Sequence, residues 1–276
     1  MGLPAPSTGG TAMVTGASAG IGAAIARELA GRGHALTLVA RREERLRSLA
    51  AELHDEHGVE AQVIACDLAD AGERERLQGE TAKRGRWVEI LVNNAGFGSR
   101  GDFVSNDTAR MVGMVRTNVE AVVDLSGRFL PGMVERGRGA LINISSTSAF
   151  QPLPGTAVYA AGKSFVLSFS EAIRTELRGS GVTVTAVCPG PIRTEFTEAA
   201  GMPEAESGTP DVFWMGAEEL ARHAVDAADA DKRVVVPGTL NRVGSIIGQH
   251  SPRALALPIA ERLWRSGTSR GGSASD

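Results

Sequence analysis

Tyr159 and Lys163 are the two side chains whose types and spacing most strongly indicate chemistry. Tyr159 is the single tyrosine of the 276-residue chain, and Lys163 is one of only three lysines, whereas arginine is abundant. At positions i and i+4 of a helix, two side chains share one face. An ammonium group stabilises a neighbouring phenolate, so we expect Lys163 to lower the pKa of Tyr159. Such a phenol can exchange a proton with a carbonyl or alcohol oxygen.

A glycine-rich turn near the N-terminus predicts a site for a phosphate group. The stretch TGASAGIG places Gly16, Gly20 and Gly22 between an expected strand at 11–15 and an expected helix at 21–34. Glycine lets the chain turn tightly and lets a pyrophosphate approach the N–H groups at the helix start. Glycine-rich turns also occur in proteins that bind no nucleotide, but the strand–turn–helix context favours a dinucleotide.

Arg41 follows the next expected strand, 19 residues after Gly22. An acidic residue at this place would accept hydrogen bonds from the ribose of NAD, whereas an arginine suits a 2′-phosphate. We therefore expect NADP(H) in preference to NAD(H). The alternative is that Arg41 and Arg42 only begin a solvated helix.

Alternating strands and helices predict an α/β fold. Apolar strands are expected at 11–15, 35–40, 60–66, 88–94, 140–145, 182–188 and 233–237. They are continuous apolar runs, which is typical of strands covered on both faces, and helical segments separate nearly all of them. We predict one doubly wound domain over 1–238, with a seven-stranded, mostly parallel sheet. Residues 239–276 form an extension packed on this domain, and the polar end, 266–276, is expected to be disordered.

Composition narrows the function. A net charge of −3 disfavours a general affinity for nucleic acid. No apolar run reaches the about 18 residues of a membrane span, and no signal peptide is recognisable. Cys66 and Cys188 lie in apolar stretches and are expected to be buried free thiols of a cytoplasmic protein. His54 and His57 lie in a polar helix end, and no metal site is expected.

Taken together, the motifs resemble those of the short-chain dehydrogenase/reductase family over nearly the whole chain. They occur in the family's order: TGASAGIG, CDLA, NNAG, RTNVEA, INISSTSA, YAAGK and PGPIRT. The resemblance implies a Rossmann fold and hydride transfer between NAD(P) and a carbonyl compound or secondary alcohol. Gly162 departs from the family, which usually has serine there, and we expect only a packing change.

The resemblance also implies roles for particular residues. Tyr159 is expected to be the general acid/base, with Lys163 adjusting its pKa and holding the nicotinamide ribose. Ser146 would bind the substrate oxygen, and Asn118 would hold a water at a helix kink. The cofactor-binding residues implied by position are Gly16, Ser18, Gly20, Ile21, Gly22, Arg41, Asp67, Leu68, Asn94, Tyr159, Lys163, Ile192 and Thr194. From its residues alone, Asp67 is equally suited to cap the following helix.

Substrate identity is expected to depend on the loop 191–216. Phe196, Met202, Phe213 and Trp214 either line an apolar pocket or pack beneath this loop. The absence of a charged cluster in the loop favours a medium or large apolar carbonyl substrate. The tail 241–267 covers the cleft, contacts another subunit of a homodimer or homotetramer, or lies on a membrane surface.

Two other functions remain open from the sequence. A non-catalytic NADP-binding sensor or scaffold would need the glycine-rich turn but not the Ser146–Tyr159–Lys163 set. A sugar-nucleotide epimerase or dehydratase has a similar Tyr–Lys pair, but usually a longer chain and different glycine spacing.

Overall fold

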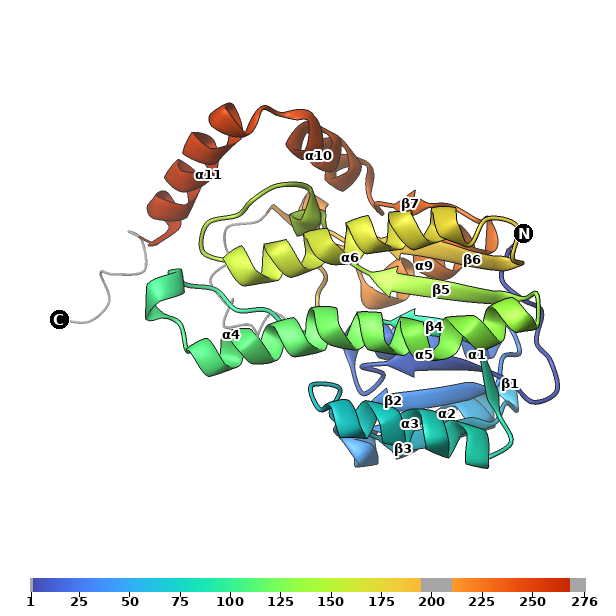
Figure 1. Ribbon diagram of the computed structural model, residues 1–276. Coiled ribbons are helices and arrows are strands. Elements are labelled where there is room, and N and C mark those ends of the chain that lie inside the picture. The colour runs from blue at the N-terminus through green and yellow to red at the C-terminus, as the bar shows by residue number, and fades with distance from the viewer. Residues whose placement is uncertain (1, 195–209, 269–276) are drawn as a thin grey trace.

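A seven-stranded parallel sheet forms the centre of the computed structural model (Figure 1). The structure describes residues 2–194 and 210–268. The strands lie in the order β3-β2-β1-β4-β5-β6-β7. The chain moves outward from β1 in one direction and then restarts at β4 in the other, which is the doubly wound Rossmann arrangement. The predicted fold class is confirmed.

The strand boundaries lie close to those expected from the apolar runs. The strands are β1 (Gly10–Thr15), β2 (Leu36–Ala40), β3 (Ala61–Ala65), β4 (Trp87–Asn93), β5 (Gly139–Ile144), β6 (Val182–Val187) and β7 (Val234–Val235). Most boundaries differ by one residue from the expectation. Only β7 is much shorter than its apolar run, because β6 pairs with just these two residues.

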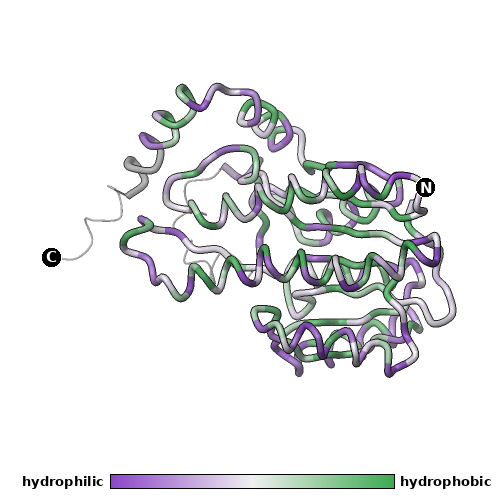
Figure 2. Tube along the Cα trace, viewed as in Figure 1, coloured by the Kyte–Doolittle hydropathy of each residue, from purple (hydrophilic) through white to green (hydrophobic). Residues whose placement is uncertain are grey.

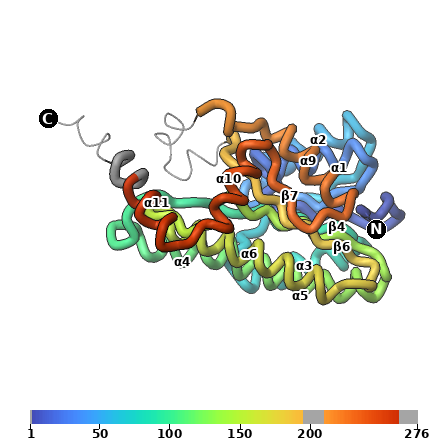
Figure 3. Tube along the Cα trace, turned by 90° about the horizontal axis from the view of Figure 1, so that it is seen from above, coloured from blue at the N-terminus to red at the C-terminus, as the bar shows by residue number. Residues whose placement is uncertain are grey.

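Helices cover both faces of the sheet, as Figures 1 and 3 show. One face carries α1 (Gly20–Gly31), α2 (Glu43–His57) and α9 (Ala217–Asp229). The other carries α3 (Ala71–Lys83), α4 (Thr108–Val115), α5 (Ala121–Glu135) and α6 (Ala157–Glu176). Alternate strand residues serve the two layers. Val14 joins the cluster beneath α1, α2 and α9, whereas Met13 joins the cluster beneath α3 and α5.

Several short elements and two C-terminal helices complete the fold. The short elements are η1 (Phe103–Ser105), the π-helical turn η2 (Arg116–Glu120), η3 (Thr147–Phe150) and η4 (Asp211–Phe213). The C-terminal helices are α10 (Thr239–His250) and α11 (Arg253–Thr268). α10 packs against η3 and η4 at the carboxyl edge of the sheet, and α11 extends beyond it (Figure 1). The expectation of a disordered end falls largely on 269–276, outside the described residues.

Candidate active site

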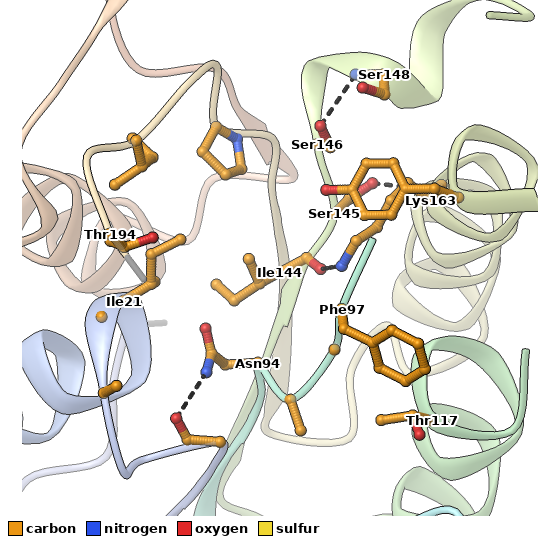
Figure 4. A pocket seen from close by; sticks show the side chains of 18 of the residues that line it. Ile21, Asn94, Phe97, Thr117, Ile144, Ser145, Ser146, Ser148, Lys163 and Thr194 are labelled. Carbon is orange, nitrogen blue, oxygen red and sulfur yellow. Dashed lines mark hydrogen bonds between the residues drawn. The ribbon is translucent and has the colours of Figure 1, made fainter. Parts of the chain in front are cut away.

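A cavity of about 730 Å³ lies at the carboxyl edge of the sheet (Figure 4). It brings together most of the residues expected from the sequence. Those that line it are Gly16, Ser18, Gly20, Ile21, Arg41, Asp67, Leu68, Asn94, Ser146, Tyr159, Lys163, Ile192 and Thr194. Gly22 and Asn118 are not among the lining residues, and each contacts residues that are.

The glycine-rich turn has the shape that the sequence predicted. Gly16 and Gly20 have φ angles of 67° and 55°, a region that side chains rarely allow. A Cβ atom at Gly22 would lie 2.4 Å from the Gly16 carbonyl oxygen, so the helix start can approach the turn only without a side chain. No side chain caps α1 at Ala19. The first amides of α1 are therefore available to an anion such as a pyrophosphate, and the cradle fits a dinucleotide.

Two arginines stand beside this turn. Arg41 and Arg42 both line the cavity and both are exposed. The Arg42 guanidinium donates to the Ser18 hydroxyl from Nε (3.2 Å) and from Nη2 (3.1 Å). The sequence favoured Arg41 because it is nearer the strand end. The structure adds Arg42, whose contact with Ser18 depends on a turn 24 residues away.

Asn94 and Asp67 have partners within the protein. Asn94 donates through its side-chain amide to the Thr15 carbonyl (2.8 Å) and through its backbone N–H to the Thr15 hydroxyl (2.9 Å). Asn94 thus fixes the end of β4 to the end of β1, beside the glycine-rich turn. Asp67 accepts from the Ala69 N–H (3.0 Å), and the cap of α3 is instead Asp70.

Asn118 lies in the π-helical turn η2, so the expected helix kink is present. Its side chain is bonded at both ends to one backbone unit. Oδ1 accepts from the Phe97 N–H (3.1 Å), and Nδ2 donates to the Phe97 carbonyl (2.9 Å). Asn118 is buried and holds the segment that follows β4 against the π turn.

Ser146, Tyr159 and Lys163 converge on one wall of the cavity. The Ser146 side chain interacts with the Tyr159 hydroxyl. The Lys163 Nζ lies 5.7 Å from the centre of the Tyr159 ring and donates to the Ile144 carbonyl (2.8 Å). Ser146 Oγ also accepts from the Ser148 N–H at 3.1 Å (Figure 4). These contacts fix the positions of both polar groups that flank the phenol.

Ser145 and Gly162 support this wall from behind. Ser145 Oγ donates to the Lys163 carbonyl (2.7 Å), so it ties β5 to α6 and has a different role from its neighbour Ser146. Gly162 is buried against the π turn, and a Cβ atom there would lie 3.3 Å from Val119 Cγ2. A serine at this position would therefore require a small shift of Val119, which agrees with the expected packing change.

The pKa of Tyr159 differs from the sequence expectation. Burial of the hydroxyl raises the pKa of Tyr159 to about 12, and the hydrogen bond with Ser146 only partly opposes this. Burial also lowers the pKa of Lys163 to about 8. The expected lowering of the Tyr159 pKa by Lys163 is wrong for this geometry, because desolvation outweighs any attraction from an ammonium that is bonded to Ile144.

A buried polar chain beneath the site was missed from the sequence. Asn93 Nδ2 donates to Asn143 Oδ1 (2.9 Å), and Asn143 Nδ2 donates to Ser170 Oγ (2.8 Å). These bonds join β4, β5 and α6. Asn93 ends its apolar strand and Asn143 is the last but one residue of its strand, which is the only signal that could have singled them out.

Apolar side chains from distant segments also line the cavity: Phe97, which lies beside Lys163 (Figure 4), and Leu153 and Trp214. The part of the lining that Trp214 forms is called the outer wall. Arg193 holds Trp214 by placing its guanidinium 5.4 Å from the ring centre, and it also pairs with Asp211 at 2.6 Å. Of the aromatic residues expected from the loop, Trp214 lines the cavity and Phe213 does not. Phe196 and Met202 lie outside the described residues.

The C-terminal extension contributes to this wall through Asn241 of α10. Asn241 Nδ2 donates to the Phe213 carbonyl (3.1 Å), immediately before Trp214. Its side chain also fills the space beside Gly190, where a Cβ atom would lie within 2.5 Å of it. α10 therefore braces the segment that carries Trp214.

The two cysteines are free and buried, as predicted. Burial raises the pKa of both thiols, Cys66 and Cys188, to about 12. Neither thiol is suited to act as a nucleophile at neutral pH, because the thiolate is the reactive form.

Comparison with known proteins identifies the group of enzymes to which this geometry belongs. The profile of the family described as short chain dehydrogenase matches residues 10–205. A very-long-chain 3-oxoacyl-CoA reductase of Anas platyrhynchos is 35% identical over 214 residues, covering 75% of this chain and 67% of that protein. Sulfoacetaldehyde reductase 2 of Chromohalobacter salexigens is 39% identical, covering 67% of this chain and 73% of that protein.

Solved structures agree with these sequence matches. A short-chain dehydrogenase from Sphingobium yanoikuyae, in complex with NADPH, has a TM-score of 0.78 and 35% identity, covering 86% of this chain and 92% of its own. A bulky-bulky ketone specific alcohol dehydrogenase from Comamonas testosteroni has a TM-score of 0.73 and 29% identity, covering 96% of both chains. The named relatives are reductases and dehydrogenases, so they give no support to a non-catalytic sensor or scaffold.

Proposed function

Because this chain belongs to the short-chain dehydrogenase family and is a nicotinamide-dependent oxidoreductase of carbonyl and alcohol groups, we propose that it is an NADPH-dependent reductase of apolar carbonyl compounds. The observation that carries this proposal is the convergence of Ser146, Tyr159 and Lys163 on a cavity that the apolar side chains of Phe97, Leu153 and Trp214 also line. The nicotinamide supplies the hydride.

Tyr159 is the proposed proton donor. Its hydroxyl remains protonated at neutral pH and can donate to the alkoxide that forms when a carbonyl is reduced. Ser146, which lies on the same wall as that hydroxyl, would share the substrate oxygen with it. Lys163 would hold the ribose hydroxyls of the cofactor and stabilise the negative charge that develops on Tyr159.

For Asn118 we propose a positioning role. The resemblance led us to expect a water held by this residue, but its amide is already bonded at both ends to Phe97. By fixing Phe97 and the π turn, Asn118 would set the floor of the cavity beside Lys163.

Gly16, Ser18, Gly20, Ile21 and Gly22 form the proposed pyrophosphate and ribose site. Asp67 and Leu68 would lie beside the adenine, and Ile192 and Thr194 beside the carboxamide. We propose that NADP(H) is preferred because Arg41 and Arg42 stand together at the place of the 2′-phosphate. The NADPH complex of the Sphingobium relative supports this preference.

The apolar wall favours a bulky carbonyl substrate. Phe97, Leu153 and Trp214 offer no charged group to a carboxylate or phosphate. The Comamonas enzyme, which covers this chain almost completely, is described as specific for bulky-bulky ketones. We propose that residues 1–238, including the loop 191–216, are the catalytic domain and that 239–276 are its extension.

A homodimer or homotetramer is the proposed assembly. α4, α5 and α6 lie side by side and expose Val115, Val123 and Phe165. Phe165 stacks on Phe169 with ring centres 5.9 Å apart, so this face offers a continuous apolar patch to another subunit. The reduced, buried cysteines favour a cytoplasmic location.

A screen of NADPH oxidation against aldehydes, ketones, diketones and steroids tests the proposal. We expect turnover with bulky apolar ketones, which requires the intact Tyr159 hydroxyl. Binding of NADPH without turnover of any compound in these classes would contradict the reductase assignment.

A further inference from the structure

Helix α10 rests on the domain through its polar and small residues. Asn241, Ser245 and Gly248 are spaced i, i+4 and i+7, so they form one face of the helix. Asn241 bonds to the Phe213 carbonyl, Ser245 is buried, and a Cβ atom at Gly248 would lie 3.1 Å from the Gln151 side chain. An amphipathic helix of a globular domain normally buries its apolar face instead.

The apolar face of α10 points away from the domain. It consists of Leu240, Val243, Ile246 and Ile247, and Ile247 is 61% exposed. On α11, Leu255 and Ile259 share a face and are 65% and 59% exposed. Figure 2 shows these apolar stretches in green along both helices, interrupted by polar residues. A group of large exposed side chains of this kind marks an interaction surface.

The same two helices are cationic. Arg242, Arg253 and Arg262 are exposed on α10 and α11, and Glu261 is the one acidic residue from 239 to 262. The chain as a whole has a net charge of −3, so the positive charge is concentrated on the helices that expose isoleucine and leucine. Apolar side chains combined with arginines are typical of helices that lie at the surface of an anionic membrane.

The lengths of α10 and α11 indicate how they would contact a membrane. α10 has 12 residues and α11 has 16, and none of the described helices is long and apolar enough to cross a bilayer. The two helices are suited to lie in the plane of the membrane, with apolar side chains among the acyl chains and arginines at the headgroups.

We propose that α10 and α11 form a lipid-binding surface that holds this protein on anionic membranes. α10 packs on η3 and η4, and the cavity-lining residues Ser148 and Trp214 lie in or beside those elements. The cavity therefore lies close to the docked surface, where an apolar substrate dissolved in lipid would be concentrated. The lipid contact itself does not depend on the proposed reaction.

A second copy of the chain is the less favourable occupant. Pairing two identical surfaces would bring the arginines of one protomer close to those of its partner. The face of α4, α5 and α6 offers an apolar contact where acidic residues balance the arginines, because 108–135 contains Glu120, Asp124 and Glu135 beside Arg110, Arg116 and Arg128. A bilayer with anionic headgroups satisfies both the apolar and the cationic side chains of α10 and α11.

Flotation with lipid vesicles tests the proposal on the full chain. One set of vesicles contains phosphatidylcholine alone, and the other an equal mixture of phosphatidylcholine and phosphatidylglycerol. We expect binding to the mixed vesicles that weakens as salt is added. The double variant Ile247→Glu/Leu255→Glu should bind at least about tenfold more weakly. Arg242→Gln, Arg253→Gln and Arg262→Gln should each weaken binding to mixed vesicles by about fivefold.

Val134→Glu is the matched control. Val134 is an exposed valine near the end of α5, which precedes the start of β5 and so lies at the opposite edge of the sheet. This variant should bind vesicles as the unmodified protein does. Thermal unfolding checks that each variant is folded, and Ile247→Ser replaces the double variant if that one is not.

Two results would overturn the proposal. The first is that the unmodified, folded protein floats with neither set of vesicles. The second is that the Ile247→Glu/Leu255→Glu variant keeps its vesicle binding but loses subunits in light-scattering measurements, which would show that the surface contacts a second copy. NADPH oxidation in detergent-free buffer, measured separately, reports on the proposed reaction.

Discussion

The two walls of the cavity are built in different ways. The inner wall is the part of the site that carries Tyr159, together with the residues that support it. There, the side chains of Asn94, Ser145 and Lys163 are hydrogen-bonded to backbone carbonyl groups of strands and helices. On the outer wall, Trp214 is held by an exposed ion pair between Arg193 and Asp211, and by the bond from Asn241 to its neighbour.

The two walls differ in how much stability a substitution costs. A buried polar group that loses its partner is destabilised by about 1–3 kcal/mol, so the inner wall tolerates few changes. An exposed ion pair contributes about 0–1 kcal/mol, so the outer wall can be rebuilt for another substrate without unfolding the domain. Changes to the inner wall should therefore abolish the reaction, and changes to the outer wall should redirect it.

The largest effect is expected for Tyr159→Phe. The substitution removes one hydroxyl and keeps the ring, so the fold and NADPH binding should survive. If the hydroxyl donates the proton, kcat should fall by about 10²- to 10⁴-fold. Steady-state kinetics with a good ketone measure this, and a near-normal rate would remove Tyr159 from the proposed mechanism.

Lys163→Ala extends this test on the same wall. It should lower kcat comparably and also weaken NADPH binding, because the same ammonium is proposed to hold the ribose. Lys163→Arg should rescue poorly, since a planar guanidinium does not replace a compact ammonium in a tight site.

The next largest effect is expected on the preference for NADPH over NADH, when Arg41 or Arg42 is replaced. Bidentate contacts to a 2′-phosphate should favour NADPH over NADH by about 10- to 100-fold. Arg41→Asp should reverse the preference, and Arg42→Ala should weaken NADPH more than NADH, because it removes the guanidinium beside Ser18. Fluorescence titration of both cofactors measures this. Arg47→Ala, whose guanidinium pairs with Glu43, is the control. Equal affinity for both cofactors in the unmodified protein would refute the preference.

The pH profile should reflect the inner wall. Below about pH 8 both Lys163 and Tyr159 are protonated, which is the state that reduction requires. Above the Lys163 pKa of about 8, the ammonium that stabilises a forming phenolate is lost. The rate of reduction should be level below this pH and then fall by up to about tenfold per unit. Measurements of kcat/KM across this range test the sign, and a rate that rises above pH 8 would contradict it.

A substitution in the outer wall should change which ketones are preferred as substrates and should leave the enzyme active. Trp214→Ala enlarges the cavity, so kcat/KM for bulky ketones should rise relative to that for small ketones by about tenfold. NADPH affinity should change little, because Trp214 is not among the residues proposed to hold the cofactor. Paired assays with a small and a bulky ketone measure the ratio, and a uniform loss with both substrates would show that Trp214 supports the reaction itself.

The smallest effect is expected for Asn241→Ala. Removing its bond to the Phe213 carbonyl loosens the segment that holds Trp214, so KM should rise by about two- to fivefold with kcat nearly constant. Arg222→Ala, an exposed change on α9 away from the cavity, is the control. A fall in kcat without a change in KM would show that α10 acts on the inner wall instead.

The fold and most of the inner wall could be predicted from local features of the sequence. Apolar runs, glycine spacing and the i, i+4 relation of Tyr159 and Lys163 are local features, and the backbone responds to them within a few residues. Parallel strands carry the residues that follow their carboxyl ends to one edge of the sheet. Gly16, Arg41, Asn94 and Ser146 could therefore be assigned to one site before any distance was known.

The contacts between these groups could be identified only from the three-dimensional structure. Two of these contacts join segments far apart in the chain: the hydrogen bonds from Arg42 to Ser18, and the two hydrogen bonds between the Asn118 amide and the Phe97 backbone. The structure also shows that Trp214, and not Phe213, lines the cavity. The pKa of Tyr159 also follows from three-dimensional packing, because desolvation is set by everything that surrounds the hydroxyl. The outward direction of the apolar face of α10 could likewise be seen only in the structure, because helical periodicity predicts a face but not the direction in which it points.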